Sequence, residues 1–193
     1  FFSDAPPTRR CLLAAVLSSF AFDFVTRQKV GGTHLNFFVV EQLPVLPPET
    51  FDAPCPWDAS TTVASWLATR VLELTYTAWD LAGFAADLGY DGPPFRWHDQ
   101  RRAVLRSELD ACFFHLYEID RDDIEYILGT FPVVRRRDEA AYGEYRTARL
   151  ILESYDAMVK AAASGFAFHT TLIPPPTDPS LAPPSRPSSE VRT

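Results

Sequence analysis

The segment Arg27 to Asn36, RQKVGGTHLN, gathers hydrogen-bond donors around two adjacent glycines. The donor side chains are Arg27, Lys29, Thr33, His34 and Asn36. Donors of these types bind phosphate oxygens and base edges, and Gly31-Gly32 permits a positive φ and a close approach of the backbone. The segment therefore suits a loop in a nucleic-acid groove. It suits equally a helix-to-strand turn in which Thr33 and Asn36 bond the local backbone and His34 is half-buried.

A second cluster of donors is the triplet Arg135-Arg136-Arg137, which precedes a helix that the pattern predicts to start at Asp138. Guanidinium groups at such a place can clamp phosphates, and the free amides of the first helical turn can assist them. The alternative is a solvated charge run, paired with Asp138, Glu139 and the acidic stretch from Asp120 to Glu125. The sequence leaves both interpretations open.

Three tyrosines, Tyr142, Tyr145 and Tyr155, lie on this predicted helix. A tyrosine ring can stack on a base that has been turned out of the duplex. Aromatic residues at helical spacing are more typical of packing between helices. We therefore expect these rings to hold the helix against its neighbours.

The elements that must position these side chains are mainly helical. Residues 11–26 predict one short apolar helix that ends at Gly31-Gly32, and LNFFVVEQLPV (35–45), rich in β-branched and aromatic residues, predicts a buried strand. Over residues 60–88, apolar residues recur every three or four positions and so form an apolar stripe along one face, which is typical of one or two helices.

Further helices are expected over residues 99–117, from Asp120 to Gly129, and from Asp138 to Gly165. Residues 173–193 are rich in proline and serine, which predicts a disordered tail. The fold class is therefore mainly α (α+β), a helical bundle-like region with a small β element at its amino-terminal end.

Composition limits the function classes that fit the chain. Its 193 residues are 47% hydrophobic and 22% charged, which is typical of a folded domain. The net charge of -7 argues against an independent nucleic-acid binder, so any such surface must be local. The three cysteines show neither disulfide nor zinc spacing, and no apolar run suits a membrane span. We expect a cytoplasmic protein without a membrane partner or a bound metal.

Two separated segments, FAFDFVTRQKVGGTHLNFFVVEQLPVLPP (20–48) and TFPVVRRRDEAAYGEYRTARLILESYD (130–156), carry a family resemblance. They resemble the carboxy-terminal part of large adenine-specific DNA methyltransferases, the type IIG-like enzymes of restriction-modification and phage-defence systems. The resemblance spans residues 11–160 and is looser between the two segments. The resemblance implies two partners. One is double-stranded DNA, and the other is an upstream methyltransferase domain of the same parent protein.

By this resemblance, the parent enzyme transfers a methyl group from S-adenosylmethionine to adenine N6. The chain contains neither the Asn-Pro-Pro-aromatic motif of that reaction nor a glycine-rich cofactor loop. No histidine has a Ser or Cys at a spacing typical of a hydrolase, and neither lysine has the acid two positions before it that a nuclease site would need. We therefore expect no catalytic residue and no cofactor site within this chain.

The resemblance also implies a domain organisation. Residues 1–48 would end a target-recognition domain, 49–165 would form a helical spacer, and 166–193 would form the tail. The DNA contacts would come from Arg27, Lys29, Thr33, His34, Asn36, Arg135, Arg136 and Arg137.

The alternative function is a helical protein-protein interaction module whose acidic faces dock a partner without contact to DNA. Convergence of Arg27, Lys29 and the arginine triplet on one face would favour DNA binding, whereas dispersal among acids would favour the module. If the chain belongs to a larger domain, we expect an exposed apolar patch on residues 35–43.

Overall fold

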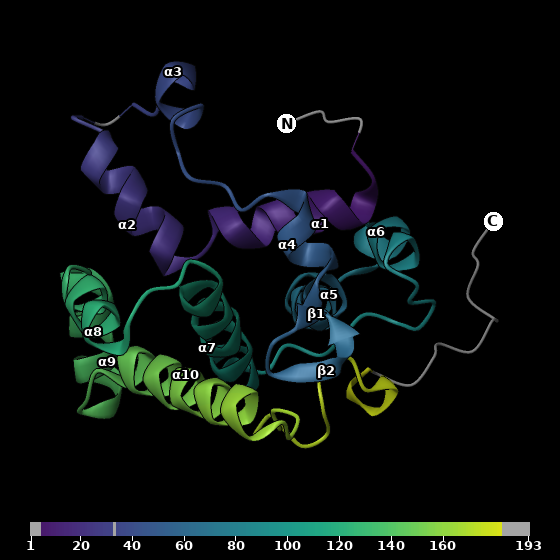
Figure 1. The fold of residues 1–193 in the computed structure, drawn as a ribbon. Coiled ribbons are helices and arrows are strands. Elements are labelled where there is room, and N and C mark those ends of the chain that lie inside the picture. Colours follow the sequence, from purple (N-terminus) through teal and green to yellow (C-terminus); the bar gives the residue numbers. More distant parts are fainter. Residues whose placement is uncertain (1–4, 33, 183–193) are drawn as a thin grey trace.

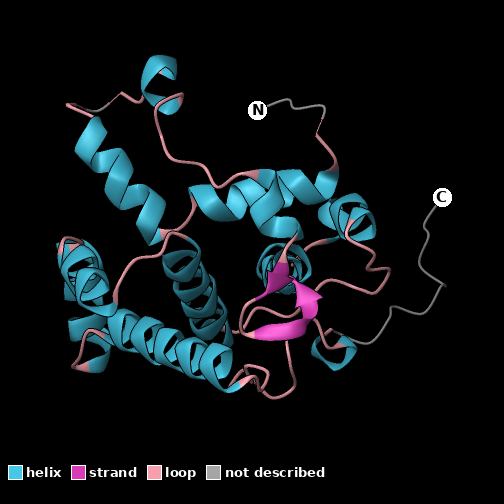
Figure 2. Ribbon diagram, viewed as in Figure 1, coloured by secondary structure: helices cyan, strands magenta, loops and turns pink. Residues whose placement is uncertain are grey.

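The structure is a computed structural model that describes residues 5–32 and 34–182. Within these residues it is mainly helical with one small antiparallel sheet, which confirms the predicted fold class (Figure 1, Figure 2). The first helices are α1 (Pro7–Leu17), α2 (Phe20–Lys29), α3 (Phe37–Val40), α4 (Pro48–Asp52), α5 (Val63–Thr75) and α6 (Ala82–Asp87). The later helices are α7 (Asp99–Leu116), α8 (Arg121–Gly129), α9 (Pro132–Tyr142) and α10 (Arg146–Ser164). The remaining elements are the strands β1 (Pro54–Cys55) and β2 (Asp58–Thr62) and the 3-10 helices η1 (Trp79–Leu81) and η2 (Pro179–Leu181).

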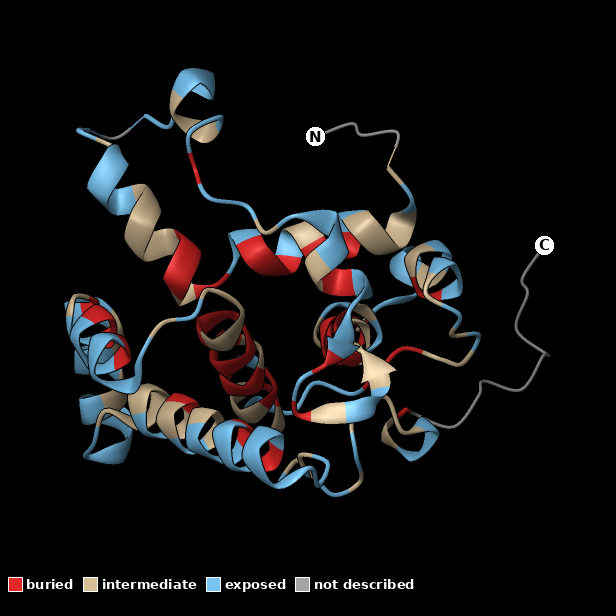
Figure 3. Ribbon diagram, in the orientation of Figure 1, coloured by how far each residue is buried: buried red, intermediate tan, exposed pale blue. Residues whose placement is uncertain are grey.

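Helix α7 is the centre of the core, with α10 packed along it and α5 and α2 on its other sides (Figure 1). Its middle turns are almost entirely buried (Figure 3). Phe113 packs in one cluster with Leu67 of α5, and Phe114 packs in another with Ile124 and Ile151 of α8 and α10. Helix α7 therefore contributes to two apolar clusters, in which the apolar faces of the helices pack against one another.

Residues 11–26, predicted as one helix, are divided between α1 and α2, which are bent by 65°. Ser18 and Ser19 lie at the bend, where the Ser19 hydroxyl accepts a hydrogen bond from the Phe22 amide and caps α2. Serine competes in this way with the helical hydrogen-bond ladder, so it favours a helix start over a helix interior. No single described helix combines the length and apolarity needed to cross a membrane; α1 and α2 meet these criteria only as a bent pair.

The predicted strand at residues 35–45 is wrong. The segment forms the helical turn α3, in which the Asn36 carbonyl accepts the amides of Val39 and Val40. A β-branched, aromatic sequence forms a strand only where a neighbouring strand supplies hydrogen bonds, and the sheet lies instead at β1 and β2. Helix α3 projects from the body (Figure 1), and Phe37 and Phe38 are 73% and 72% exposed. The apolar exposure expected of residues 35–43 is therefore found at Phe37 and Phe38, whereas Leu43 is buried.

One predicted helix is interrupted, and the span predicted as one or two helices is divided. Gly143 adopts a left-handed conformation with φ 74° and separates α9 from α10, within the predicted helix from Asp138 to Gly165. Tyr76 leaves the helical region at the end of α5, so residues 60–88 contain α5, η1 and α6. The predictions of helices at 99–117 and from Asp120 to Gly129 are confirmed by α7 and α8.

Residues 166–182, which we call the carboxy-terminal strap, run against the helices, whereas the sequence predicts a disordered tail. The Arg101 guanidinium donates to the carbonyls of Pro174 (2.6 Å) and Pro175 (2.9 Å). Arg101 also pairs with Glu73, which accepts the Thr177 amide at 2.9 Å. Side chains of α5 and α7 thus satisfy the backbone of a proline-rich segment. The rest of the predicted tail, residues 183–193, lies outside the described residues.

We expect Arg101→Met to lower the free energy of unfolding by about 2 kcal/mol, because hydrogen bonds to a charged group contribute about 1.5–3 kcal/mol. Urea denaturation measures this loss, and limited proteolysis should show faster cleavage within the strap. Arg96→Met is the matched control, since Arg96 is exposed and its side chain bonds no described residue. Equal cleavage rates for Arg101→Met and the unmodified chain would contradict the assignment of Arg101 as the tether.

Candidate functional site

The basic end of α2 lies beside the start of α9. The Arg27 guanidinium carbon is 4.5 Å from the centre of the Phe131 ring, and Phe20 meets the same ring edge-on at 4.7 Å. Phe24 packs in the same way against Tyr126 of α8, at 6.2 Å. Aromatic contacts therefore fix α2 against α8 and the residue that precedes α9. We call the exposed basic side chains of the last turn of α2 and the first two turns of α9 the α2–α9 surface; they are Arg27, Lys29, Arg135 and Arg136.

The two best-placed arginines of the α2–α9 surface each pair with an acid of their own helix. Arg27 donates to Asp23 from Nε (3.0 Å) and Nη2 (2.8 Å), and Arg135 donates to Glu139 at 2.8 Å. The hydrogen bond to Asp23 raises the pKa of Arg27, so its charge is retained. Exposed pairs between neighbouring helical turns are weak, so a phosphate can replace the carboxylate at little cost.

The arginine triplet does not precede a helix, and the prediction of a helix start at Asp138 is wrong. Pro132 begins α9, so all three arginines lie within it. Consecutive residues of an α-helix point about 100° apart, so the three side chains cannot all face one ligand. Arg136 is exposed on the surface, whereas Arg137 lines a separate cleft. The triplet is therefore split between two sites.

The predicted loop is only partly joined to this surface. Lys29 and Arg136 are exposed and form no hydrogen bond or ion pair with the residues that the structure describes. His34 and Asn36 are exposed on the segment that leads into α3, and Thr33 lies outside the described residues. Gly31 and Gly32 have open space around them and no positive φ. The structure thus brings Arg27 near the start of α9 and leaves residues 34–36 on the projecting segment.

A cleft of about 490 Å³ between α7, α9 and α10 contains four arginines, and we call it the arginine cleft. They are Arg102, Arg106, Arg137 and Arg146. Sequence reasoning missed three of them. The signal that was present is the four-residue spacing of Arg102 and Arg106, which places both on one face of α7.

Carboxylates also line the arginine cleft, and each has its own donor. Asp110 accepts the Phe20 amide at 2.9 Å, Asp138 accepts the Thr147 amide at 2.5 Å, and Asp99 accepts the Trp97 indole N–H at 2.7 Å. Burial raises the pKa of Asp110 to about 7, although the amide of Phe20 and the charge of Arg106 oppose this.

The tyrosines have mainly packing roles. Tyr145 donates its hydroxyl to the Leu128 carbonyl at 3.1 Å, and Tyr155 donates to the Ile119 carbonyl at 3.0 Å. Tyr155 also stacks on His115, with 4.0 Å between ring centres. Tyr142 is half-exposed at the arginine cleft, with the Arg146 guanidinium 4.7 Å from its ring.

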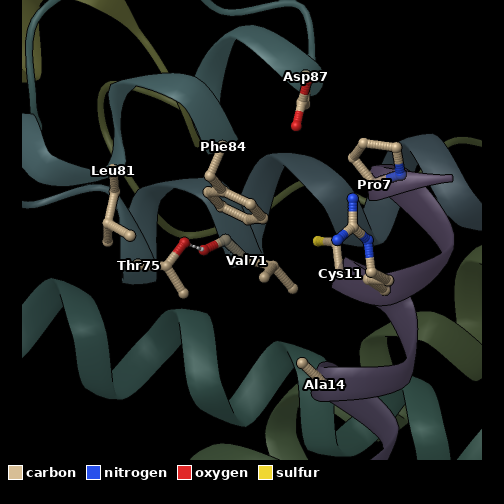
Figure 4. Close-up of a pocket in the computed structure, with 9 residues that line it drawn as sticks. Pro7, Cys11, Ala14, Val71, Thr75, Leu81, Phe84 and Asp87 are labelled. Atoms are coloured by element: carbon tan, nitrogen blue, oxygen red, sulfur yellow. Dashed lines mark hydrogen bonds between the residues drawn. The ribbon is translucent and has the colours of Figure 1, made fainter. Parts of the chain in front are cut away.

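A second cavity of about 410 Å³ lies between α1, α5 and α6 (Figure 4). Its wall is mostly apolar, with Val71 and Phe84 facing Cys11. Burial raises the pKa of the Cys11 thiol to about 11, so the thiol is protonated and a poor nucleophile at neutral pH. Among the described residues, no group of three or more His, Cys, Asp or Glu side chains could hold a metal ion. The apolar lining and the protonated thiol together favour a packing role for the residues of this cavity.

Comparison of the chain with protein-family models, with curated proteins and with solved structures gave no match.

Proposed function

We propose that this chain binds duplex DNA as the target-recognition and spacer part of an adenine-N6 DNA methyltransferase in a restriction-modification or phage-defence system. The observation that carries this is the contact of Arg27 with Phe131, at 4.5 Å. It joins the two segments that resemble such enzymes, although a hundred residues separate them in the chain. The two segments that carry the resemblance thus contact each other in the fold, which supports the proposal.

The α2–α9 surface has the chemistry that phosphate contacts need. Lys29 and Arg136 are exposed without a described partner. Arg27 and Arg135 each pair with one partly exposed acid, and Arg27 also lies against the Phe131 ring. Phosphate contacts of this kind supply most non-specific affinity and orient a protein on the duplex. The net charge of -7 confines such binding to this local surface.

Methyl transfer would be carried out by the upstream methyltransferase domain, which would bind S-adenosylmethionine. This chain would hold the duplex in register with that domain, in the cytoplasm. Its helical region would set the distance between the two.

We expect duplex binding to weaken with salt, and Lys29→Ala/Arg136→Ala to flatten the dependence. Each lost phosphate contact should reduce the slope of log K against log salt by about 0.9. Fluorescence anisotropy with a labelled duplex, from about 50 to 200 mM salt, measures the slope. Arg96→Ala/Lys160→Ala is the charge-matched control, because both side chains are exposed and lie outside α2 and α9. Absence of binding at the lowest salt, or an unchanged slope in the double variant, would rule out this surface.

A specific observation favours the alternative, a protein-protein interaction module. Leu35, Phe37 and Phe38 are at least half exposed on the projecting segment around α3. Neighbouring exposed apolar side chains of this size are typical of a surface that a protein partner covers. If the salt series shows no binding to DNA, this module is the better description of the chain.

A further inference from the structure

The arginine cleft has more positive charge than its own contacts use. Arg106 and Arg137 are exposed at its edge and form no hydrogen bond or ion pair with any described residue. Arg146 donates to the neutral side chain of Gln100 at 2.5 Å. Three guanidinium groups from three helices therefore face one concave space without a carboxylate bonded to them.

Arg102 supplies a further, deeply placed donor. Its residue is 9% exposed, its guanidinium carbon lies 3.6 Å from the centre of the Trp97 ring, and Nη1 donates to the Leu74 carbonyl at 2.8 Å. Its Nε is buried and has no hydrogen-bond partner. A buried donor without a partner is uncommon in folded proteins, and it favours an anion or a water at this place. Burial, together with the charge of Arg106, lowers the pKa of Arg102.

The acids of the arginine cleft do not neutralise these arginines by direct pairing. Asp138 and Asp110 accept backbone amides, and Asp99 accepts the indole of Trp97. None of the three forms an ion pair with an arginine of the cleft. The guanidinium groups are thus available to an external anion.

We propose that the arginine cleft binds a phosphate monoester, the terminal phosphate of a nucleotide or of a nucleic-acid strand. Guanidinium groups match the geometry of phosphate oxygens and bind them with charge-assisted hydrogen bonds. Arg106, Arg137 and Arg146 would hold the oxygens, and the half-exposed Tyr142 ring would lie beside the ester group. A volume of about 490 Å³ is in the range of small-molecule sites. This site is separate from the α2–α9 surface, since α7 and α10 supply most of its donors.

Isothermal titration of the full chain with inorganic phosphate and with adenosine 5′-monophosphate, at constant ionic strength, tests this site. We expect saturable binding of both, and no binding of adenosine. Arg106→Gln and Arg137→Gln should each weaken binding about tenfold or more, the loss expected for a charged hydrogen bond. Both side chains are exposed, so these substitutions should leave the fold intact. Failure of phosphate and adenosine 5′-monophosphate to bind, or equal affinity in all variants, would overturn the site.

Arg136→Gln is the matched control, because Arg136 neighbours Arg137 but does not line the arginine cleft. It should bind phosphate normally and, if the α2–α9 surface binds DNA, should weaken binding to the duplex. Loss of phosphate binding in Arg136→Gln would overturn the assignment to the cleft. Single strands with and without a 5′ phosphate distinguish the source of the ligand. Tighter binding of the phosphorylated strand supports a strand end, and equal binding of both strands alongside phosphate binding supports a free nucleotide.

Discussion

Glu108→Ala should lower the free energy of unfolding by about 3–5 kcal/mol, the range expected when one partner of a buried ion pair is removed. Glu108 accepts from Arg70 Nε at 2.7 Å, and the two side chains are 1% and 6% exposed. The Arg70 guanidinium also lies 3.3 Å from the centre of the Trp66 ring, so it cannot turn to solvent without opening the core. The substitution would leave a buried charge without its counterion. Urea denaturation followed by circular dichroism measures the loss.

Glu153→Ala provides the matched control. Glu153 pairs with Arg149 at 3.0 Å, but the two side chains are 58% and 43% exposed, and such pairs contribute at most about 1 kcal/mol. The double substitution Arg70→Met/Glu108→Leu removes both charges and should recover much of the stability lost by Glu108→Ala. If Glu108→Ala and Glu153→Ala are equally stable, the buried pair does not support the fold in the way that its geometry indicates.

The helices that could be predicted from the sequence are those with strong local signals. Residues 99–117 and 120–129 have apolar residues at helical spacing, and Asp120 and Gly129 mark the ends of the second helix. Helices α7 and α8 match these expectations. Propensity and periodicity are properties of a few neighbouring residues, so no knowledge of the tertiary fold was required.

The failures are segments whose conformation depends on a distant partner. Residues 35–45 have strand-forming residues but no neighbouring strand, so their backbone bonds close locally in α3. The carboxy-terminal strap has the composition of a disordered tail, yet Arg101 and Glu73 satisfy its backbone from α7 and α5. Composition does not show a hydrogen bond that joins residues seventy or more positions apart.

The candidate sites were predicted only in part for the same reason. Arg27 and the triplet were identified by residue type, but their relation depends on the packing of Phe131, the residue before α9, against α2. The helical period then turns Arg137 away from Arg135 and into the arginine cleft. Residue type thus identified the donors, and the packing of the helices decided which of them share a site.

The pH dependence of stability should carry a large contribution from Asp110, the buried carboxyl of the arginine cleft. Burial raises its pKa from the ordinary value of 3.8 to about 7 in the folded state. Between these values the unfolded chain has lost the Asp110 proton while the folded chain keeps it. The contribution of Asp110 to stability should therefore be most favourable at and below pH 4, fall as the pH rises toward 7, and then stay low. One pKa unit corresponds to about 1.4 kcal/mol, so the whole loss is at most about 4 kcal/mol.

Asp110→Asn should remove this pH dependence, because the amide oxygen can still accept the Phe20 amide but carries no charge to desolvate. At pH 8 the variant should be more stable than the unmodified chain by up to about 4 kcal/mol, and near pH 4 the two should converge. Urea denaturation at intervals of pH measures both. Asp156→Asn is the control, because this exposed carboxyl pairs with Arg121 at the surface and should leave the profile unchanged. A variant that is less stable than the unmodified chain at pH 8 would show that Asp110 is ionised in the fold and that Arg106 and Arg102 hold it as a counterion, which would also weaken the case for an anion in the arginine cleft.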